Sequence, residues 1–265
     1  MIVVINDNNQ SIAENHGGIY KNLFELRKTK GKAENNIFKA MGLNYIYVDE
    51  GNDIEELISA FKSVKNIGKP IVVHLSTNKG NGFKPAEINK EDFHFGVPFD
   101  IETGEFKRNK SGQKDEDYSS ITLDFLINSV KNDKTVAVLT AGTPGDFELS
   151  KEVREKMGKQ YIDVGIAEEH AVAMSSGLAK NGAKPVFCVC SSFIQRTYDQ
   201  LSQDLCLNNN PALILVYYAS VYRANDVTHL GIFDIPMISN IPNIVYLAPT
   251  TKEEYLAMLD WSIEQ

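Results

Sequence analysis

Residues 161–170 read YIDVGIAEEH, an apolar run that ends at a glycine and is followed by two carboxylates and a histidine. Tyr161 to Val164 is typical of a strand, and the small and apolar residues after it recur at helical spacing. This pattern places Glu168 in the first turn of a helix, just after the carboxyl end of a strand. Ligands bind at that edge of a parallel sheet, where a partly desolvated carboxylate is poised for proton exchange. The alternative is that Glu168 and Glu169 only favour the positive helix N-terminus.

The same alternation of strand and helix patterns recurs along the chain on both sides of this stretch. Helical patterns separate apolar runs at 2–5, 45–48, 71–75, 135–140, 161–164, 185–190, 212–218 and 244–249. This rhythm predicts an α/β protein built from two successive domains with mostly parallel sheets, each of them incomplete.

Residues 86–118 are polar and rich in glycine, proline and charge. A structureless run of this length is uncommon inside a compact domain, so we predict a linker there. The predicted domains are therefore residues 1–85 and residues 119–265, the second cut short at its C-terminus. Because Met1 leads directly into a buried-strand run and a helix ends the chain, we expect the chain to be a piece of something longer.

The composition excludes several classes of protein. The chain has 265 residues, of which 43% are hydrophobic and 23% charged, with a formal net charge of −8. An acidic chain of this kind is not expected to bind nucleic acid. The apolar runs are shorter than the roughly 20 residues of a membrane span, and the start does not resemble a signal peptide, so we expect a cytoplasmic protein without a membrane partner. Its three cysteines lack the spacing of a zinc site or a disulfide framework.

Two polar loops follow predicted strands. NDNNQSIAENHGG (6–18) is dense in amide and carboxylate oxygens, which are the ligands that Mg²⁺ prefers. A plain Asn/Asp/Gly turn cluster is the alternative for this loop. STNKGNGFKPAE (76–87) combines two glycines that allow close approach of a ligand with two lysines.

Several segments in order resemble one family, the thiamine-diphosphate enzymes of the transketolase type, and within it the 1-deoxy-D-xylulose-5-phosphate synthases. The first loop resembles the family's NDNxMSISxNxGG, and YIDVGIAEEHAV resembles FIDVGIAEQHAV. Further matching segments are KGNGFKPAE (79–87), FHFGVPFD (93–100), SSFIQRTYDQ (191–200) and THLGIFD (228–234). The resemblance runs through nearly the whole chain.

The resemblance implies a domain that binds the cofactor's diphosphate, followed by a domain that binds its aminopyrimidine. Asn8 and the main-chain carbonyl of Gln10 then fall on ligands of Mg²⁺, and Phe83 falls on an aromatic near the cofactor. Phe193 falls on the aromatic that packs against the aminopyrimidine. Glu168 falls on the glutamate that hydrogen-bonds a ring nitrogen of that pyrimidine and so sets its tautomer.

The implied reaction joins pyruvate and glyceraldehyde 3-phosphate to give 1-deoxy-D-xylulose 5-phosphate and CO₂, a step toward isoprenoid precursors and thiamine. The enzyme is then a transferase of two-carbon units that acts as a homodimer. His94 and His229 fall on family histidines that face substrate and could shuttle protons. His16, His74 and His170 lack such a match, so we interpret them as structural.

Three departures from the family pattern lie near the substrate. The family has tyrosine where this chain has Cys190, arginine where it has Tyr218, and aspartate where it has Asn225. Tyrosine cannot make the bidentate contact that arginine makes with a phosphate, so we expect a weaker phosphate site unless Arg196, Arg223 or Lys84 substitutes. A second hypothesis is therefore a transketolase-like paralogue with a different, unphosphorylated acceptor.

The family's Gly-Asp-Gly segment, whose aspartate is the main charged ligand of Mg²⁺, is absent from the printed sequence. We therefore expect this chain alone to be inactive. It is a fragment of a larger enzyme, one subunit whose partner brings the Gly-Asp-Gly half, or a non-catalytic relative that serves in dimerisation or binding.

Overall fold

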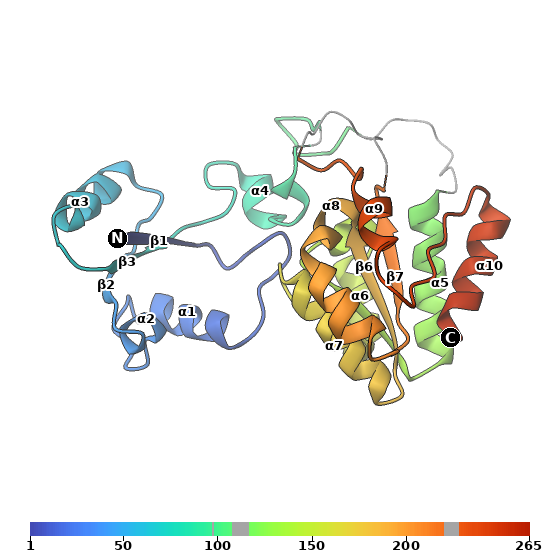
Figure 1. Cartoon of the computed structure of the whole chain (residues 1–265). Coiled ribbons are helices and arrows are strands. Elements are labelled where there is room, and N and C mark those ends of the chain that lie inside the picture. The colour runs from blue at the N-terminus through green and yellow to red at the C-terminus, as the bar shows by residue number, and fades with distance from the viewer. Residues whose placement is uncertain (97, 108–116, 220–227) are drawn as a thin grey trace. The chain divides into compact units, whose positions relative to one another are not determined.

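The structure is a computed structural model that describes residues 1–96, 98–107, 117–219 and 228–265. The chain forms two compact units, Met1–Ser111 and Gly112–Gln265 (Figure 1). The division falls inside the segment that we expected to be a linker. Each unit is described by itself.

The first unit is built on a sheet of three parallel strands, with β3 in the centre of the order β1-β3-β2. The strands are β1 (Ile2–Asp7), β2 (Asn44–Val48) and β3 (Ile71–Ser76). The helices are α1 (Gly18–Lys28), α2 (Ile37–Ala40), α3 (Ile54–Val64) and α4 (Lys84–Ile88), followed by the 3-10 turn η1 (Asp92–His94). Asp53 caps α3, because its carboxylate accepts hydrogen bonds from the first-turn amides of Glu55 and Glu56.

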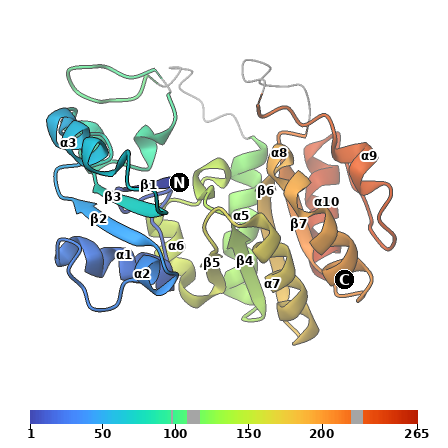
Figure 2. The same cartoon turned by 60° about the vertical axis from the view of Figure 1, so that its left-hand side comes forward.

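Alternate residues of β3 pack on opposite faces of this sheet, which is why the whole strand reads as an apolar run. Ile71, Val73 and Leu75 pack toward α3. Val72 packs toward α1 and α2 on the other face, as Figure 2 shows for the helices. His74 shares that second face and is fully buried. The sheet therefore holds one imidazole inside its core.

Part of the predicted linker is folded and belongs to the first unit. Phe93 stacks against Phe83, Phe99 and Phe106 with ring centroids 4.8–5.7 Å apart. A β-bridge also pairs Phe99 with Phe106. These four phenylalanines are spread over 24 positions and show no helical or strand period. Only the repeated occurrence of phenylalanine in this segment could have indicated the cluster.

The second unit contains a sheet of four parallel strands in the order β5-β4-β6-β7. The strands are β4 (Val136–Thr140), β5 (Tyr161–Asp163), β6 (Lys184–Cys190) and β7 (Leu213–Tyr217). The α-helices are α5 (Tyr118–Asn132), α6 (Lys151–Met157), α7 (Glu168–Lys180), α8 (Ser191–Ile194), α9 (Asp234–Ile238) and α10 (Lys252–Ile263). Short turns are η2 (Pro144–Phe147), η3 (Gly158–Gln160) and η4 (Gln195–Thr197), and η5 (Gln200–Cys206) is a π-helix.

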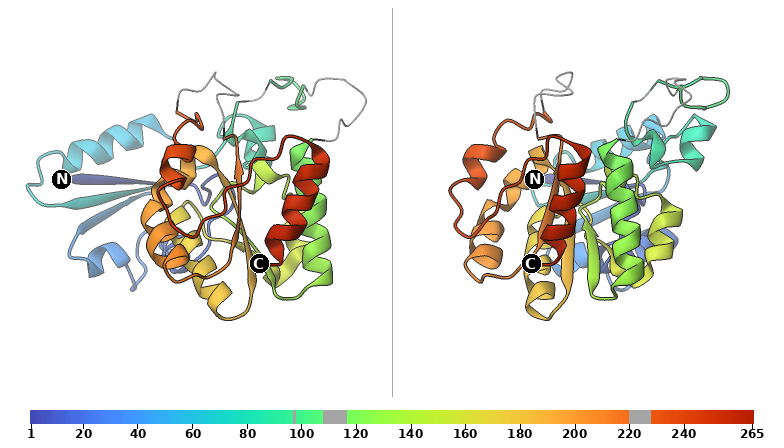
Figure 3. Two further views of the ribbon diagram at one scale, coloured as in Figure 1. Left: turned by 45° about the vertical axis from the view of Figure 1, so that its right-hand side comes forward. Right: turned by 90° about the vertical axis from the view of Figure 1, so that its right-hand side faces the viewer.

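Both faces of this second sheet are covered by helices, so the sheet is buried in the way that parallel sheets are. Helices α5 and α10 lie side by side on one face, the green and red helices of Figure 3. Helix α7 and the π-helix η5 cover the other face, where Phe187 and Leu139 are fully buried. The mostly parallel α/β architecture predicted from the sequence is confirmed.

The prediction of a strand at 244–249 is wrong. These residues form no strand, so the described sheet ends at β7. Instead the Tyr246 hydroxyl donates a hydrogen bond to Asp234 at 2.8 Å, while Val245 is 64% exposed. An apolar run alone does not make a strand when it has no neighbouring strand to pair with.

Among the described residues, every helix is too short or too polar to cross a membrane.

Candidate cofactor and substrate site

Glu168 lies at the start of α7, five residues after β5 ends, as the sequence predicted. The residue is only 2% exposed. Its Oε2 atom is buried and has no hydrogen-bond partner in the part of the chain that the structure describes. A buried carboxylate oxygen without a donor is unfavourable for folding, which points to a donor supplied by a ligand.

The electrostatic environment of Glu168 is mixed. Burial raises the pKa of its carboxyl, while its own backbone amide and the Arg196 guanidinium act to lower it. The Nη1 atom of Arg196 is 3.7 Å from Oε2 of Glu168, which is beyond hydrogen-bond distance. Arg196 Nε instead donates to Glu169 at 3.2 Å. The net shift of the Glu168 pKa is upward, as expected of a carboxylate held for proton exchange.

Asn8 and Gln10 lie together in the loop that follows β1. The Asn8 side-chain oxygen accepts a hydrogen bond from the Gln10 backbone amide at 3.0 Å. Asn9 between them has a φ of 64°, a left-handed conformation that asparagine tolerates well. The loop thus brings together the two neutral oxygen donors that the resemblance assigns to Mg²⁺.

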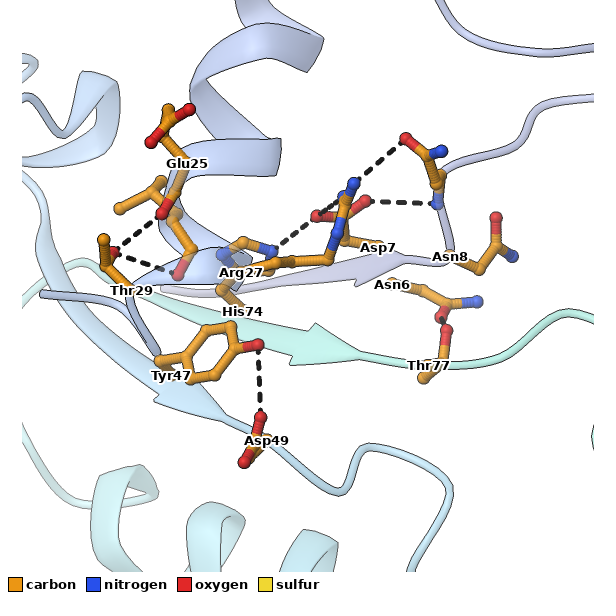
Figure 4. Close-up of polar contacts among 12 residues, drawn as sticks. Asn6, Asp7, Asn8, Glu25, Arg27, Thr29, Tyr47, Asp49, His74 and Thr77 are labelled. Carbon is orange, nitrogen blue, oxygen red and sulfur yellow. Dashed lines mark hydrogen bonds and ion pairs between the residues drawn. The ribbon is translucent and has the colours of Figure 1, made fainter. Parts of the chain in front are cut away.

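A buried polar network, made of Asp7, Arg27, His74 and Tyr45, anchors this loop to the sheet. Arg27 and His74 both point toward the Asp7 carboxylate (Figure 4), His74 through Nε2 at 2.9 Å. The other ring nitrogen of His74 is 2.8 Å from the Tyr45 hydroxyl. Arg27 also donates to Asn9 at 3.0 Å, so it holds the chain on both sides of Asn8.

Two of these groups, Asp7 and His74, were not recognised as part of a site from the sequence. Burial raises the pKa of the Asp7 carboxyl, but the hydrogen bonds from His74 and Arg27 outweigh it and hold the pKa below its ordinary value. Asp7 is therefore ionised and already paired. The carboxylate beside Asn8 is engaged with Arg27 and His74 within the fold.

His94 is connected to the same loop through Lys79. The Lys79 ammonium is 3.1 Å from Nδ1 of His94 and donates to the Ser11 carbonyl at 2.7 Å. Burial and the neighbouring Lys79 lower the pKa of His94, so its imidazole is neutral near pH 7. Phe83 packs in the phenylalanine cluster, with Phe99 at 5.4 Å between ring centroids.

In the second unit, Phe193 and His229 are in contact. Phe193 follows β6 in the short helix α8, and its ring meets the His229 imidazole edge to face at 5.3 Å. Nδ1 of His229 is 2.5 Å from the Thr228 hydroxyl. The structure thus brings two predicted residues together at the carboxyl end of β6.

Cys190 and Tyr218 converge on a residue that the sequence did not single out, Asp146 in η2. The Cys190 thiol donates to Oδ2 of Asp146 at 3.2 Å. The Tyr218 hydroxyl lies 3.5 Å from Oδ1, at the outer limit of a hydrogen bond. The three residues come from the carboxyl ends of β6, β7 and β4. A lone Asp in a Gly/Pro turn offers no sequence signal of such a contact.

Position 231 requires glycine, because other backbone atoms approach it closely at the carboxyl edge of the second sheet. A Cβ atom there would lie 2.2 Å from the Tyr218 carbonyl oxygen and 2.7 Å from the Ser191 hydroxyl. Tyr218 itself has a φ of 60°, a strained conformation for a tyrosine. The backbone at Gly231 therefore packs directly against the backbone of Tyr218.

Replacing Gly231 with alanine is expected to lower the free energy of unfolding by about 1–3 kcal/mol, because the new methyl group overlaps backbone atoms. Urea unfolding measures the change. Gly177→Ala in α7 is the matched control, since a Cβ there meets nothing within 4 Å and alanine favours a helix. An unchanged stability of Gly231→Ala would show that the close approach is not present in solution.

Two remaining predictions concern Arg196 and Asn225. Arg196 is engaged with Glu168 and Glu169 rather than with the Cys190 and Tyr218 pair. Asn225 lies outside the described residues, as does Arg223. A groove of about 620 Å³ between α5 and α10 is lined by other residues, among them Asp124, Lys252 and Leu256.

The residues at these positions can be compared with the groups that thiamine diphosphate and Mg²⁺ require. Glu168 fits, because its orphaned oxygen matches a ring N–H donor. The metal ligands fit in type, since Asn8 and Gln10 offer neutral oxygens to a hard cation. Within residues 1–96, 98–107, 117–219 and 228–265, no three His, Cys, Asp or Glu side chains are grouped to hold a metal ion.

Comparison with known proteins gives two family matches. The model described as "Transketolase, pyrimidine binding domain" matches residues 115–265, and the model of 1-deoxy-D-xylulose-5-phosphate synthase matches residues 26–77.

Individual proteins are also similar to this chain. A 1-deoxy-D-xylulose-5-phosphate synthase from Listeria monocytogenes is 35% identical over 98% of this chain and 43% of its own length. One from Halothermothrix orenii is 38% identical over 84% of this chain and 34% of its own. The transketolase from Campylobacter jejuni superposes with a TM-score of 0.47 at 15% identity, covering 98% of this chain and 49% of that chain. The chain spans less than half the length of each of these relatives.

Proposed function

We propose that this chain, which belongs to the transketolase family, works in a thiamine-diphosphate- and Mg²⁺-dependent carboligase. The proposed reaction resembles that of 1-deoxy-D-xylulose-5-phosphate synthase: the two-carbon unit of pyruvate is transferred to a three-carbon aldehyde, such as glyceraldehyde 3-phosphate, with release of CO₂. The observation that carries the proposal is the buried Glu168 carboxylate at the first turn of α7, whose Oε2 has no donor among the described residues.

When bound, thiamine diphosphate supplies the nucleophilic carbon that decarboxylation and carbon–carbon bond formation require. Glu168 accepts a hydrogen bond from a ring N–H of the aminopyrimidine and so selects its tautomer. Phe193 packs against the face of that ring. Asn8 and the Gln10 carbonyl hold Mg²⁺, and Phe83 lies near the cofactor.

The histidines are assigned to the substrate. His94 is neutral near pH 7 because burial and Lys79 lower its pKa, so it can accept a proton from a substrate hydroxyl or return it. His229 lies against Phe193. This contact supports a role for His229 beside the proposed aminopyrimidine position. We assign both histidines to substrate positioning and proton transfer.

The charged ligand of Mg²⁺ is proposed to come from outside the described residues, because Asp7 is already paired with Arg27 and His74. A partner subunit or another part of the protein would supply it in a Gly-Asp-Gly segment. We also propose that the protein is a cytoplasmic homodimer. Its product would feed the synthesis of isoprenoid precursors and of thiamine.

Isothermal titration calorimetry with thiamine diphosphate and Mg²⁺ tests the proposal, on protein purified from its own source so that any partner chain is retained. We expect saturable binding that weakens when Mg²⁺ is chelated, because the cation joins the diphosphate to the Asn8 loop. Absence of binding at millimolar ligand, together with a stable oligomer, would support the non-catalytic reading instead.

A second candidate function is a transketolase-like carboligase with an unphosphorylated acceptor. One observation favours it: Tyr218 stands where the family has arginine, and its hydroxyl is directed at the Asp146 carboxylate.

A further inference from the structure

The first turn of α7 holds Glu168 without a capping side chain. The residue before it, Ala167, is the N-cap of α7 and has no side-chain oxygen to accept a hydrogen bond from the first-turn amides. Glu168 is nevertheless buried, although burial of a carboxylate is unfavourable. The start of the helix must therefore be held in place by the segment that precedes it.

That segment is attached to the sheet through the carboxylate of Asp163, the last residue of β5. Oδ1 of Asp163 accepts a hydrogen bond from the Gly165 backbone amide at 2.7 Å. The Gly165 carbonyl accepts from the Ala167 amide at 2.8 Å, and the Ala167 carbonyl accepts from the Ala171 amide, one turn into α7. A continuous chain of hydrogen bonds thus runs from Asp163 to the helix that carries Glu168.

The second oxygen of the same carboxylate holds the neighbouring turn, which follows β4. Oδ2 of Asp163 accepts from the Thr140 hydroxyl at 2.6 Å and from the Gly142 amide at 3.2 Å. Thr140 is fully buried, and the Tyr161 hydroxyl lies 2.6 Å from its oxygen and 3.3 Å from Oδ2 of the carboxylate. The two turns also pack on each other, since a Cβ atom at Gly142 would lie 3.1 Å from the Ile166 side chain.

This pattern of donors requires a carboxylate at position 163. Both oxygens face hydrogen-bond donors, so both act as acceptors. An asparagine of the same shape offers one acceptor oxygen and an NH₂ group, and the NH₂ group would face either the Gly165 amide or the donors of Thr140 and Gly142. Asparagine can therefore hold one of the two turns but not both.

We propose that Asp163 is a positioning residue for Glu168: it holds the turns after β4 and β5 together, fixes the start of α7 and so keeps the Glu168 carboxylate buried with its Oε2 presented to a ligand. The proposal rests on the function proposed above for the identity of that ligand, but the placement of Glu168 is a property of the second unit without cofactor. It predicts that a change at position 163 alters the environment of Glu168, to which Asp163 is linked through the Gly165 turn.

The first test follows the Glu168 carboxyl by ¹³C NMR of glutamate-labelled protein without cofactor, with Glu168→Gln used to identify the signal. In the wild type, burial holds the pKa of Glu168 above its ordinary value of 4.5. Asp163→Asn is expected to lower this pKa toward 4.5, because a loosened helix start lets water reach the carboxylate.

Asp133→Asn is the matched control for this measurement. The Asp133 carboxylate accepts two hydrogen bonds from Thr135, before the opposite end of β4, so its replacement also removes a turn contact of the same sheet. The Glu168 pKa is expected to stay at its wild-type value in this variant. An unchanged Glu168 pKa in Asp163→Asn, or an equal fall in both variants, would overturn the proposal.

Hydrogen exchange on the wild type keeps the proposal testable even where the variant does not fold. The Gly165 amide is expected to exchange about 100-fold or more slowly than in an unfolded chain, because the Asp163 carboxylate accepts its hydrogen. Exchange of this amide at the rate of an unfolded chain would overturn the proposal.

Calorimetry with thiamine diphosphate and Mg²⁺, on the protein with any partner chain, gives the functional test. Asp163→Asn is expected to weaken cofactor binding about tenfold, and Asp133→Asn to leave it within about twofold of the wild type. Unchanged binding in Asp163→Asn would overturn the positioning role while leaving the carboligase function intact. If thiamine diphosphate does not bind to the wild type but Asp163→Asn still lowers the Glu168 pKa, the carboligase function fails and the positioning role stands.

Discussion

Glu168→Gln is expected to lower turnover by about 100-fold or more, because a neutral amide cannot stabilise a protonated ring nitrogen as a carboxylate does. Turnover is measured as pyruvate consumption with thiamine diphosphate, Mg²⁺ and aldehyde, on the protein with any partner chain. Glu169→Gln is the matched control, since Glu169 is the next residue and is partly exposed. If both acids only favoured the helix N-terminus, the two variants would behave alike, and the assigned role of Glu168 would be wrong.

The same substitution should stabilise the fold at neutral pH. Burial raises the pKa of Glu168 above its ordinary value of 4.5, so the folded state holds the proton more tightly than the unfolded state. That contribution to stability is present below the ordinary pKa and is lost as pH rises through the raised pKa. We expect Glu168→Gln to raise the free energy of unfolding by about 1 kcal/mol near pH 7, and by much less near pH 4. Urea unfolding at the two pH values measures this difference.

Asp7→Ala is expected to have the largest effect on stability, about 3–5 kcal/mol of destabilisation, because it leaves Arg27 and His74 buried without their partner. The His74 side chain is fully buried and that of Arg27 is 16% exposed, so water cannot replace the lost carboxylate well. Urea unfolding followed by circular dichroism gives the value.

Asp49→Ala controls for the loss of an ion pair in the same unit. Asp49 pairs with Lys30 at 2.6 Å, but both side chains are exposed, so the expected cost is only about 0–1 kcal/mol. Similar costs for the two variants would mean that the Asp7 network is solvated rather than buried.

The fold was predictable where local pattern and packing agree. The strand and helix around Glu168 and the cap at Asp53 follow from short sequence signals, and the structure has both. The run at 244–249 failed because strand formation depends on a neighbouring strand, which no local pattern encodes. The folded part of residues 86–118 was missed because aromatic clustering around Phe93 has no period.

The site was only partly predictable for a related reason. Asn8, Gln10 and Glu168 were found through motifs that are continuous in the sequence. The bond between Asp7 and His74 joins residues 67 positions apart, and Asp146 meets Cys190 across 44 positions. Such pairs depend on strand register, which places Asp7 opposite Ser76, two residues from His74. The interpretation of His74 as structural is confirmed, but the sequence carries no signal for its bond to Asp7 or for the contacts of Asp146.

The central claim is that the Glu168 carboxylate accepts a hydrogen bond from the cofactor's aminopyrimidine, and ¹⁵N NMR of ring-labelled thiamine diphosphate tests it most directly. With wild-type protein and Mg²⁺, the bound cofactor is predicted to show a protonated pyrimidine nitrogen, and with Glu168→Gln that signal is predicted to move to the unprotonated position. The same ring-nitrogen shift in both proteins, at equal occupancy, would contradict the account.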